Sequence, residues 1–291
     1  MISAILIGNL ANDHNVIDNR EYLGPGGSVY FAAKTFENLK VQSFLISPRG
    51  SDFPGKYLKN SVIYPVKPKS EKTLVFRNIY DPKKERVQWV ENYQNAALCD
   101  IKKILLNIPE KQNILFVAPI LNNIDISVLK LICKYFPKSL KVLLPQGFFR
   151  KIGRYGKIIS RFWQNSERII SLFDIIVISE KDWNGAEDLA KGWGKITKIS
   201  IVTKEERGCS IYMGGIKKDY PGFKITDIID ATGAGDVFAA AFSVAYLKNH
   251  DVDSSARFAN AAAALSLRFT SNQLKYNYSD IIKLLRKGER R

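Results

Sequence analysis

The 291-residue sequence is poor in the residues that form disulfide frameworks and zinc sites. It contains three cysteines and two histidines. The cysteines, Cys99, Cys133 and Cys209, are widely spaced and odd in number, which argues against a disulfide framework and against zinc knuckles. The sequence also lacks the pattern Gly-x-x-x-x-Gly-Lys, and this absence excludes the P-loop class of kinases.

Long apolar runs are also missing. No stretch approaches the length of a membrane span. Residues 1–7 have no basic leader and are too few for the apolar core of a signal peptide. Together with the low cysteine content, these features predict a cytoplasmic protein with no membrane partner.

Acidic residues are outnumbered by basic ones, 28 to 44, and the formal net charge is +16. A charge of this size favours anionic partners, from nucleotides to nucleic acids. The basic residues are scattered, however, and only residues 286–291 form a cluster. No recognition-helix pattern, aromatic RNA-binding signature or zinc finger is present. We therefore expect a solvated lysine-rich surface and no nucleic-acid partner.

Hydrophobic residues make up 46% of the chain, enough to bury a large core. From about residue 98 onward, strand-like runs alternate with helical periodicity, which predicts a mostly parallel sheet covered by helices on both faces. The helices expected there include 153–172 and 180–191. Residues 61–95 differ, because three short strand-like runs and a turn at 81–84 follow one another without a helix. They predict a small β appendage.

One stretch points to chemistry. The sequence Asp-Ala-Thr-Gly-Ala-Gly-Asp at 230–236 ends a polar turn and opens an apolar helix. Glycines allow a tight turn, and the first turn of a helix presents unpaired N–H groups that bind anions. Asp236 lies beside this anion site, where a carboxylate makes sense as the acceptor of a proton. Phosphoryl transfer to a hydroxyl needs an anion site together with a proton acceptor. A weak base suffices, because the proton of the hydroxyl leaves late in the reaction.

Two other interpretations of this stretch stay open. The glycines and Asp236 could simply begin a helix. Gly233-Ala234-Gly235 also supplies the first two glycines of a dinucleotide fingerprint, although Phe238 occupies the third position and the stretch does not follow a first strand. A second glycine turn, Gly24-Pro25-Gly26-Gly27, precedes another helical pattern.

These features together resemble the ribokinase-like, or PfkB, carbohydrate kinase family. The resemblance rests on the stretch 230–236, on the Gly26-Gly27 pair that opens a helix, and on Asp13 after the first strand. It implies a single α/β domain over residues 1–291, a three-layer sandwich with a mostly parallel central sheet. It also implies a β lid formed by residues of about 14–25 and 61–95.

The resemblance further implies the function, ATP-dependent phosphotransfer to a hydroxyl of a small sugar, inositol-like polyol or nucleoside. Asp236 would be the base, and Gly233, Ala234 and Gly235 would form the anion hole. Mg²⁺ and a monovalent cation would be the cofactors, and the chain would be a monomer or a lid-mediated homodimer. The remaining site residues that it implies are Asp13, Gly26 and Gly27 for the acceptor, and Thr203, Gly208, Asp230, Thr232 and Asn260 for ATP.

The sequence departs from the family at several of these positions. The usual Asn-x-x-Glu is replaced by 179–182, so that Asp182 would take the place of the metal-linked glutamate. The usual Thr-x-Gly turn ends in Glu205, and the asparagine that follows the glycine pair is replaced by Phe31. Gln146 and Arg150 follow a strand that often ends in Asp-Pro, and we interpret them as local acceptor contacts.

A second hypothesis follows from these departures. Weakened nucleotide motifs and a strong positive charge could describe a catalytically weak, kinase-like scaffold that binds nucleic acid or a protein complex. Asp236 speaks against this hypothesis, because a scaffold does not need that carboxylate.

Overall fold

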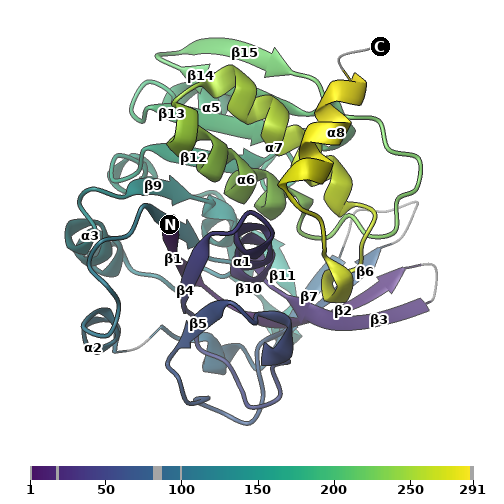
Figure 1. The fold of residues 1–291 in the computed structure, drawn as a ribbon. Coiled ribbons are helices and arrows are strands. Elements are labelled where there is room, and N and C mark those ends of the chain that lie inside the picture. The colour runs from purple at the N-terminus through teal and green to yellow at the C-terminus, as the bar shows by residue number, and fades with distance from the viewer. Residues whose placement is uncertain (1, 18–19, 81–86, 99, 289–291) are drawn as a thin grey trace.

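A nine-stranded sheet lies at the centre of the computed structural model, which describes residues 2–17, 20–80, 87–98 and 100–288 (Figure 1). The strand order is β15-β14-β13-β12-β9-β8-β1-β4-β5. The strands from β13 to β5 are parallel, and β14 and β15 extend the sheet through antiparallel pairs. The bounds of these strands are β1 Ser3–Gly8, β4 Gln42–Ile46, β5 Ser61–Tyr64, β8 Ile114–Ala118, β9 Leu140–Leu143, β12 Ile175–Ser179, β13 Ile199–Thr203, β14 Cys209–Met213 and β15 Ile216–Tyr220.

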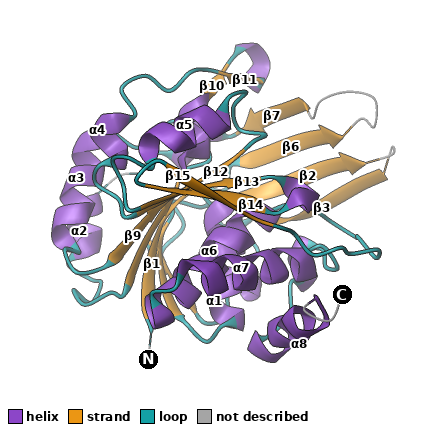
Figure 2. Cartoon of the chain, turned by 90° about the horizontal axis from the view of Figure 1, so that it is seen from above, coloured by secondary structure: helices purple, strands orange, loops and turns teal. Residues whose placement is uncertain are grey.

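Central strands of this sheet such as β1 and β8 bury side chains on both faces, and successive side chains along each strand point to opposite sides. In β1, Ala4 and Leu6 belong to one hydrophobic cluster, and Ile5 and Ile7 belong to the other. Helices cover the two faces: α1, α6 and α7 lie on one side and α2 to α5 on the other (Figure 2). Their bounds are α1 Ser28–Asn38, α2 Ile101–Leu105, α3 Ile126–Tyr135, α4 Glu167–Ile170, α5 Ala186–Trp193, α6 Ala234–Asn249 and α7 Val252–Ser266; α8 Tyr278–Gly288 packs against α7. The predicted three-layer α/β sandwich is thus confirmed.

A second sheet, which we call the lid, projects from one side of this body (Figures 1 and 2). Its order is β3-β2-β6-β7, with β2 parallel to β6 and the other pairs antiparallel. The strands are β2 Ala11–Ile17, β3 Arg20–Gly26, β6 Val75–Tyr80 and β7 Val87–Glu91. The turn expected at 81–84 lies outside the described residues.

The structure corrects the expected extent of the β appendage at its N-terminal end. The run at 62–64 is part of β5, which pairs in parallel with β4 at the edge of the large sheet. A four-residue strand carries no local signal of the sheet to which it belongs, because pairing partners far along the chain decide it.

The helix expected at 153–172 is wrong for most of its length. Residues 150–160 form a hairpin of β10 Arg150–Ile152 and β11 Ile158–Ser160, and only α4 is α-helical. At Gly156, with φ 77°, a Cβ would lie 2.2 Å from the Val90 carbonyl oxygen, so this segment passes close to β7. Pairing with the lid overrides the local helical periodicity.

The helix expected at 180–191 also begins later than predicted. Gly185, with φ 96°, precedes α5, and the chain before it forms a turn. The Asp182 carboxylate accepts a hydrogen bond from the Ser179 backbone N–H at 2.9 Å, which stabilises this turn against helix formation.

Candidate active site

Residues 230–236, which we call the glycine turn, lead directly into helix α6. Gly233 has φ 78°, a conformation that disfavours residues with a side chain. A Cβ at Gly233 would lie 2.2–2.5 Å from ring atoms of Phe31 in α1. Glycine is therefore required here both by the backbone and by the close approach of an aromatic ring.

Gly235 has the opposite surroundings. The one atom that a Cβ there would meet within 4 Å is the Thr203 hydroxyl oxygen, at 4.0 Å. Open space therefore lies between the start of α6 and the end of β13. The first amides of a helix have no preceding turn to bond, and the helix dipole adds positive potential there. This space has the character of an anion site.

Asp236 lies in the first turn of α6 and is half-buried beside this space. The preceding turn is held by Asp230, whose carboxylate accepts a hydrogen bond from the Thr232 N–H at 2.8 Å. The structure thus brings the predicted base, the two glycines and the two polar residues of the turn into one short segment. A carboxylate beside an anion site can orient and deprotonate a hydroxyl.

The predicted acceptor residues lie where lid and body meet. Asp13, in β2, is buried, and its carboxylate packs on Gly26, where a Cβ would approach it to 2.1–2.3 Å. Gly27 has φ 89° and begins α1, and its own missing Cβ leaves room for the Asn9 carbonyl oxygen. The glycine pair therefore allows Asp13 and the start of α1 to come together.

Two contacts join these residues to the glycine turn. The ring of Phe31 lies against Gly233, and the Asn15 side-chain amide donates to the Thr232 hydroxyl at 3.4 Å. Helices α1 and α6 pack side by side. Residues separated by more than 200 positions in the sequence therefore form one site beneath the lid, as predicted for the carboxyl ends of the strands of an open α/β sheet.

Gln146 and Asp182, which were expected to bind acceptor and metal respectively, contact each other. The Gln146 amide donates to one carboxylate oxygen of Asp182 at 2.9 Å, and the other oxygen accepts from Ser179 N–H. Asp182 therefore holds the loop after β12. Arg150 lies closer to the lid, where it donates to the Ile120 carbonyl at 3.0 Å.

The loop after β13 has Glu205 where the expected Thr-x-Gly turn has glycine, and its backbone keeps a conformation that glycine favours. Glu205 has φ 51°, in the left-handed region. Its exposed carboxylate pairs with Lys181 at 3.5 Å. The residue that precedes it, Lys204, is directed away by ion pairs with Glu187 and Asp219. Thr203 is thus left at the end of β13 facing the glycine turn.

Gly208 and Asn260 are both used to hold the chain after β15. Gly208, with φ 88°, leaves room for the Tyr220 carbonyl oxygen, which its Cβ would approach to 2.1 Å. The buried Asn260 amide donates to the carbonyls of Tyr220 and Pro221, at 3.2 and 3.1 Å. These two residues border the expected nucleotide region by shaping the loop that leads to the glycine turn.

Sequence reasoning missed three carboxamide side chains of the lid, Asn15, Asn78 and Gln88. They are on neighbouring strands and bond to one another, and they lie on the same side of the lid as Asp13. The spacing of two residues between Asn15 and Asp13 in β2 was a usable signal. The register that aligns Asn78 and Gln88 with Asn15 was not visible in the sequence.

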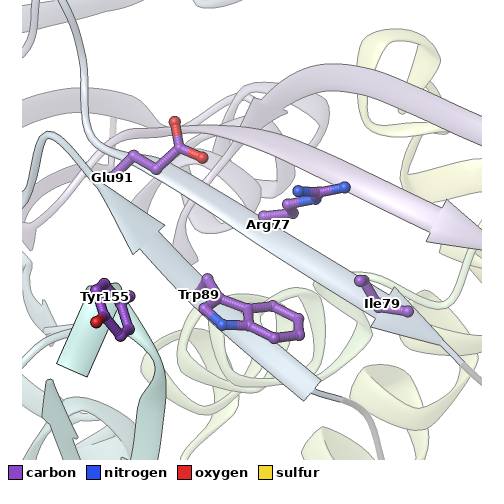
Figure 3. A pocket seen from close by; sticks show the side chains of 5 residues that line it. All are labelled: Arg77, Ile79, Trp89, Glu91 and Tyr155. Atoms are coloured by element: carbon purple, nitrogen blue, oxygen red, sulfur yellow. The ribbon is translucent and has the colours of Figure 1, made fainter. Parts of the chain in front are cut away.

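The opposite side of the lid carries a hollow of about 300 Å³ (Figure 3). It is lined by Arg77, Ile79, Trp89, Glu91 and Tyr155. Arg77 and Trp89 are adjacent in sequence to Asn78 and Gln88 and so point the other way. Another hollow, of about 380 Å³, lies between β2, β3 and the loop at 52–57, and Asp13 is among its lining residues.

Two searches of the described residues were negative. In residues 2–17, 20–80, 87–98 and 100–288, no group of three or more His, Cys, Asp or Glu side chains is arranged to hold a metal ion. Within the same residues, no helix has the length and apolar character to cross a membrane.

Comparison with known proteins finds similarity to sugar and nucleoside kinases. The family described as pfkB family carbohydrate kinase matches residues 151–275. Fructokinase-2 of Zea mays is 26% identical over 142 residues, which are 46% of this chain and 41% of the fructokinase, so this match spans less than half of that relative. The cytidine kinase of Thermococcus kodakarensis is 23% identical over 88% of this chain and 93% of its own.

Solved structures share the whole fold. A pyrophosphate-dependent kinase in the ribokinase family, in complex with sulfate, aligns with a TM-score of 0.80 and 19% identity over 97% of this chain and 99% of its own. A pyrophosphate-dependent kinase in the ribokinase family complexed with a pyrophosphate analog and myo-inositol aligns with a TM-score of 0.77 and 18% identity over 96% and 99%. At these identities the comparison shows a common fold.

Proposed function

This chain belongs to the ribokinase-like, or PfkB, family of carbohydrate kinases, and we propose that it transfers a phosphoryl group from ATP to a hydroxyl of a small sugar, polyol or nucleoside. The observation that carries this proposal is the open space at Gly235. The start of α6, Thr203 and Asp236 lie next to this space, and we assign the space to the transferring phosphoryl group.

In this proposal the glycine turn and Asp236 have separate roles in the reaction. The amides at the start of α6 stabilise charge on the transferring phosphoryl group, and their orientation is fixed before the reaction because Gly233 is locked against Phe31. Asp236 accepts a hydrogen bond from the attacking hydroxyl and takes its proton late. A weak base is adequate for a loose transition state.

The acceptor would be held beside Asp13, whose buried carboxylate accepts hydrogen bonds from hydroxyl groups. The carboxamides of Asn15, Asn78 and Gln88 lie on the same side of the lid and bond to one another. These polar surroundings support a hydroxylated acceptor. The lid would cover it and exclude water, which protects ATP from hydrolysis.

Mg²⁺ accompanies ATP in the proposed reaction and would neutralise charge on the phosphates. It commonly keeps several waters and binds through few protein carboxylates. Asp182 would suit such an indirect role through water, and the hydrogen bonds from Gln146 and from the Ser179 N–H would hold its carboxylate in place.

The decisive experiment is a panel of sugars, polyols and nucleosides, including fructose, ribose, cytidine and myo-inositol. Each is mixed with the purified chain and either ATP or pyrophosphate, and the phosphorylated acceptor is measured directly. We expect one class of acceptor to be phosphorylated well above the background of donor hydrolysis. Failure with every acceptor and both donors would contradict the proposed function.

A further inference from the structure

A continuous row of polar side chains crosses the lid and ends at the glycine turn. We call it the lid chain. Each link is a side-chain hydrogen bond: Arg150 Nη2 to Gln88 Oε1 at 3.4 Å, Gln88 Nε2 to Asn78 Oδ1 at 2.6 Å, Asn78 Nδ2 to Asn15 Oδ1 at 2.7 Å, and Asn15 Nδ2 to Thr232 Oγ1 at 3.4 Å. The row passes through β7, β6 and β2 and then leaves the lid.

Burial makes this row costly to rearrange. Asn15 and Asn78 are 6% and 4% exposed. An amide left unpaired in such surroundings is costly, because it loses its hydrogen bonds to water without replacing them. Arg150 is itself fixed, because it donates to the Ile120 carbonyl and its guanidinium lies over the Phe76 ring at 5.4 Å. The first member of the row is therefore anchored to the body of the protein.

The guanidinium sets the direction of every hydrogen bond in the row. Arginine can only donate, so Gln88 must turn its oxygen toward Arg150 and its amino group toward Asn78. The same reasoning applies at Asn78 and then at Asn15. Each amide orientation follows from its neighbour, and all the links donate toward Thr232. Chains that donate in one direction strengthen one another.

This direction determines what Thr232 can do. Its hydroxyl oxygen accepts from Asn15, so the hydroxyl donates its own hydrogen in another direction. Thr232 directly precedes Gly233, and its backbone N–H is held by Asp230. We propose that the lid chain positions the Thr232 hydroxyl as a hydrogen-bond donor to the phosphoryl group at the glycine turn. Arg150, Gln88, Asn78 and Asn15 are then positioning residues.

The inference rests on the proposed function and adds a coupling to it. The last link joins the lid to the body, so the hydroxyl is oriented only when the lid lies in the described position. Closure over the acceptor and stabilisation of the phosphoryl group would then occur together. Loss of one preorganised donor in such a site lowers turnover on the order of 10²-fold.

The substitution Asn78→Asp tests the direction of the chain. A carboxylate accepts from Gln88 but cannot donate to Asn15. Asn15 would then rotate to donate to the carboxylate, and its oxygen would face Thr232, which would have to donate toward the lid. We expect kcat to fall on the order of 10²-fold, with the acceptor KM nearly unchanged. Gln94→Glu is the matched control, because Gln94 is exposed and undergoes the same change of charge.

Repeating Asn78→Asp in a Thr232→Val background shows whether its effect on kcat acts through the Thr232 hydroxyl. Without the hydroxyl, Asn78→Asp should reduce kcat little further, so the two substitutions are strongly non-additive. Independent, multiplicative losses would overturn the inference. A raised acceptor KM that persists in the Thr232→Val background would also overturn it, and would show that Asn78 contacts the acceptor.

Binding of inorganic pyrophosphate in the absence of acceptor distinguishes failure of this inference from failure of the proposed function. By calorimetry, Asn78→Asp should weaken binding about tenfold, about 1.4 kcal/mol, and should have little effect in the Thr232→Val background. This pattern supports the lid chain even if no acceptor is phosphorylated. Equal affinities in all variants, or no binding by the unaltered chain, would overturn the inference.

Discussion

The carboxylate of Asp13 packs directly on Gly26, in the space where any other residue would place its Cβ, 2.1–2.3 Å from the carboxylate atoms. The Gly26→Ala substitution must therefore displace Asp13. We expect the acceptor KM to rise on the order of 10²-fold, because an ångström of misplacement at a binding group is that costly. The KM for ATP should change little. Gly55→Ala is the control, since no atom lies within 4 Å of its added Cβ. An unchanged acceptor KM in Gly26→Ala would contradict the role of Asp13.

Alanine substitutions at the two glycines of the turn should have opposite effects on stability. Gly233→Ala places a side chain in the left-handed region, which costs about 1–2 kcal/mol, and forces it against Phe31, so the melting temperature should fall. Gly235→Ala lies in helix α6, and alanine favours helix by about 1 kcal/mol.

Stability and turnover should therefore separate at Gly235. Its alanine variant should melt at or above the original temperature but lose turnover, because the methyl group occupies the space assigned to the phosphoryl group. Thermal denaturation and steady-state kinetics measure the two effects. Full turnover by Gly235→Ala would show that no phosphoryl group enters this space.

Glu205 has φ 51° and takes the place of the glycine that the resemblance predicts for a nucleotide turn. Glu205→Gly relieves the left-handed backbone and removes a carboxylate near the expected phosphates, and the exposed ion pair with Lys181 contributes under about 1 kcal/mol. We expect an unchanged melting temperature. The KM for ATP should fall about threefold, because removing the carboxylate removes part of its Coulomb repulsion with the phosphates. Glu206→Gly, the next residue, is the control and should only destabilise. A higher KM for ATP in Glu205→Gly would count against this assignment of the donor side.

Glu187 predicts a pH dependence of stability. Burial opposes its ionisation, but hydrogen bonds from Lys204 and Tyr212 and the charges of Lys204 and Lys217 outweigh it and hold the pKa of Glu187 below the ordinary value of 4.5. A lowered carboxylate pKa stabilises the fold above the unfolded pKa, and this stabilisation is lost as the pH falls through the folded pKa. Solvent screening limits it to about 1 kcal/mol or less, since the side chain is 39% exposed.

The corresponding experiment is thermal denaturation of Glu187→Gln at several pH values. We expect the variant to melt about 2 °C below the original chain at pH 7. The difference should shrink as the pH falls below 4.5. Glu110→Gln, at an exposed glutamate, should show no such difference. A Glu187→Gln deficit that stays constant with pH would contradict the ionic origin of the stabilisation.

Much of the architecture could be predicted from the sequence, because local patterns of residues determine it. Buried strands such as Ile114–Ala118 and the glycine turn before α6 are contiguous signals, and the alternation of strands and helices implies a parallel sheet. The hairpin at 150–160 was not accessible. Its strands pair with each other beside β7, and this tertiary contact outweighs the helical periodicity of the segment.

The site divides in the same way. Asp236 and Gly233 follow from the spacing of one motif, whereas Asn78 and Gln88 act only through neighbours supplied by strand register. Phe31 was recognised as a departure from the family, but its contact with Gly233 could not be foreseen, because it depends on how α1 packs against α6. Local sequence patterns do not determine which residues distant in the chain come into contact.

The most direct test of the account is the turnover of Asp236→Asn with the acceptor identified by the panel. The amide keeps the size of the carboxylate but cannot accept the proton of the hydroxyl. We predict a loss of kcat on the order of 10²- to 10⁴-fold, the range of general base catalysis, with ATP affinity by calorimetry unchanged within about threefold. Phosphorylation of the same acceptor at the original rate would contradict the assignment of Asp236 as the catalytic base.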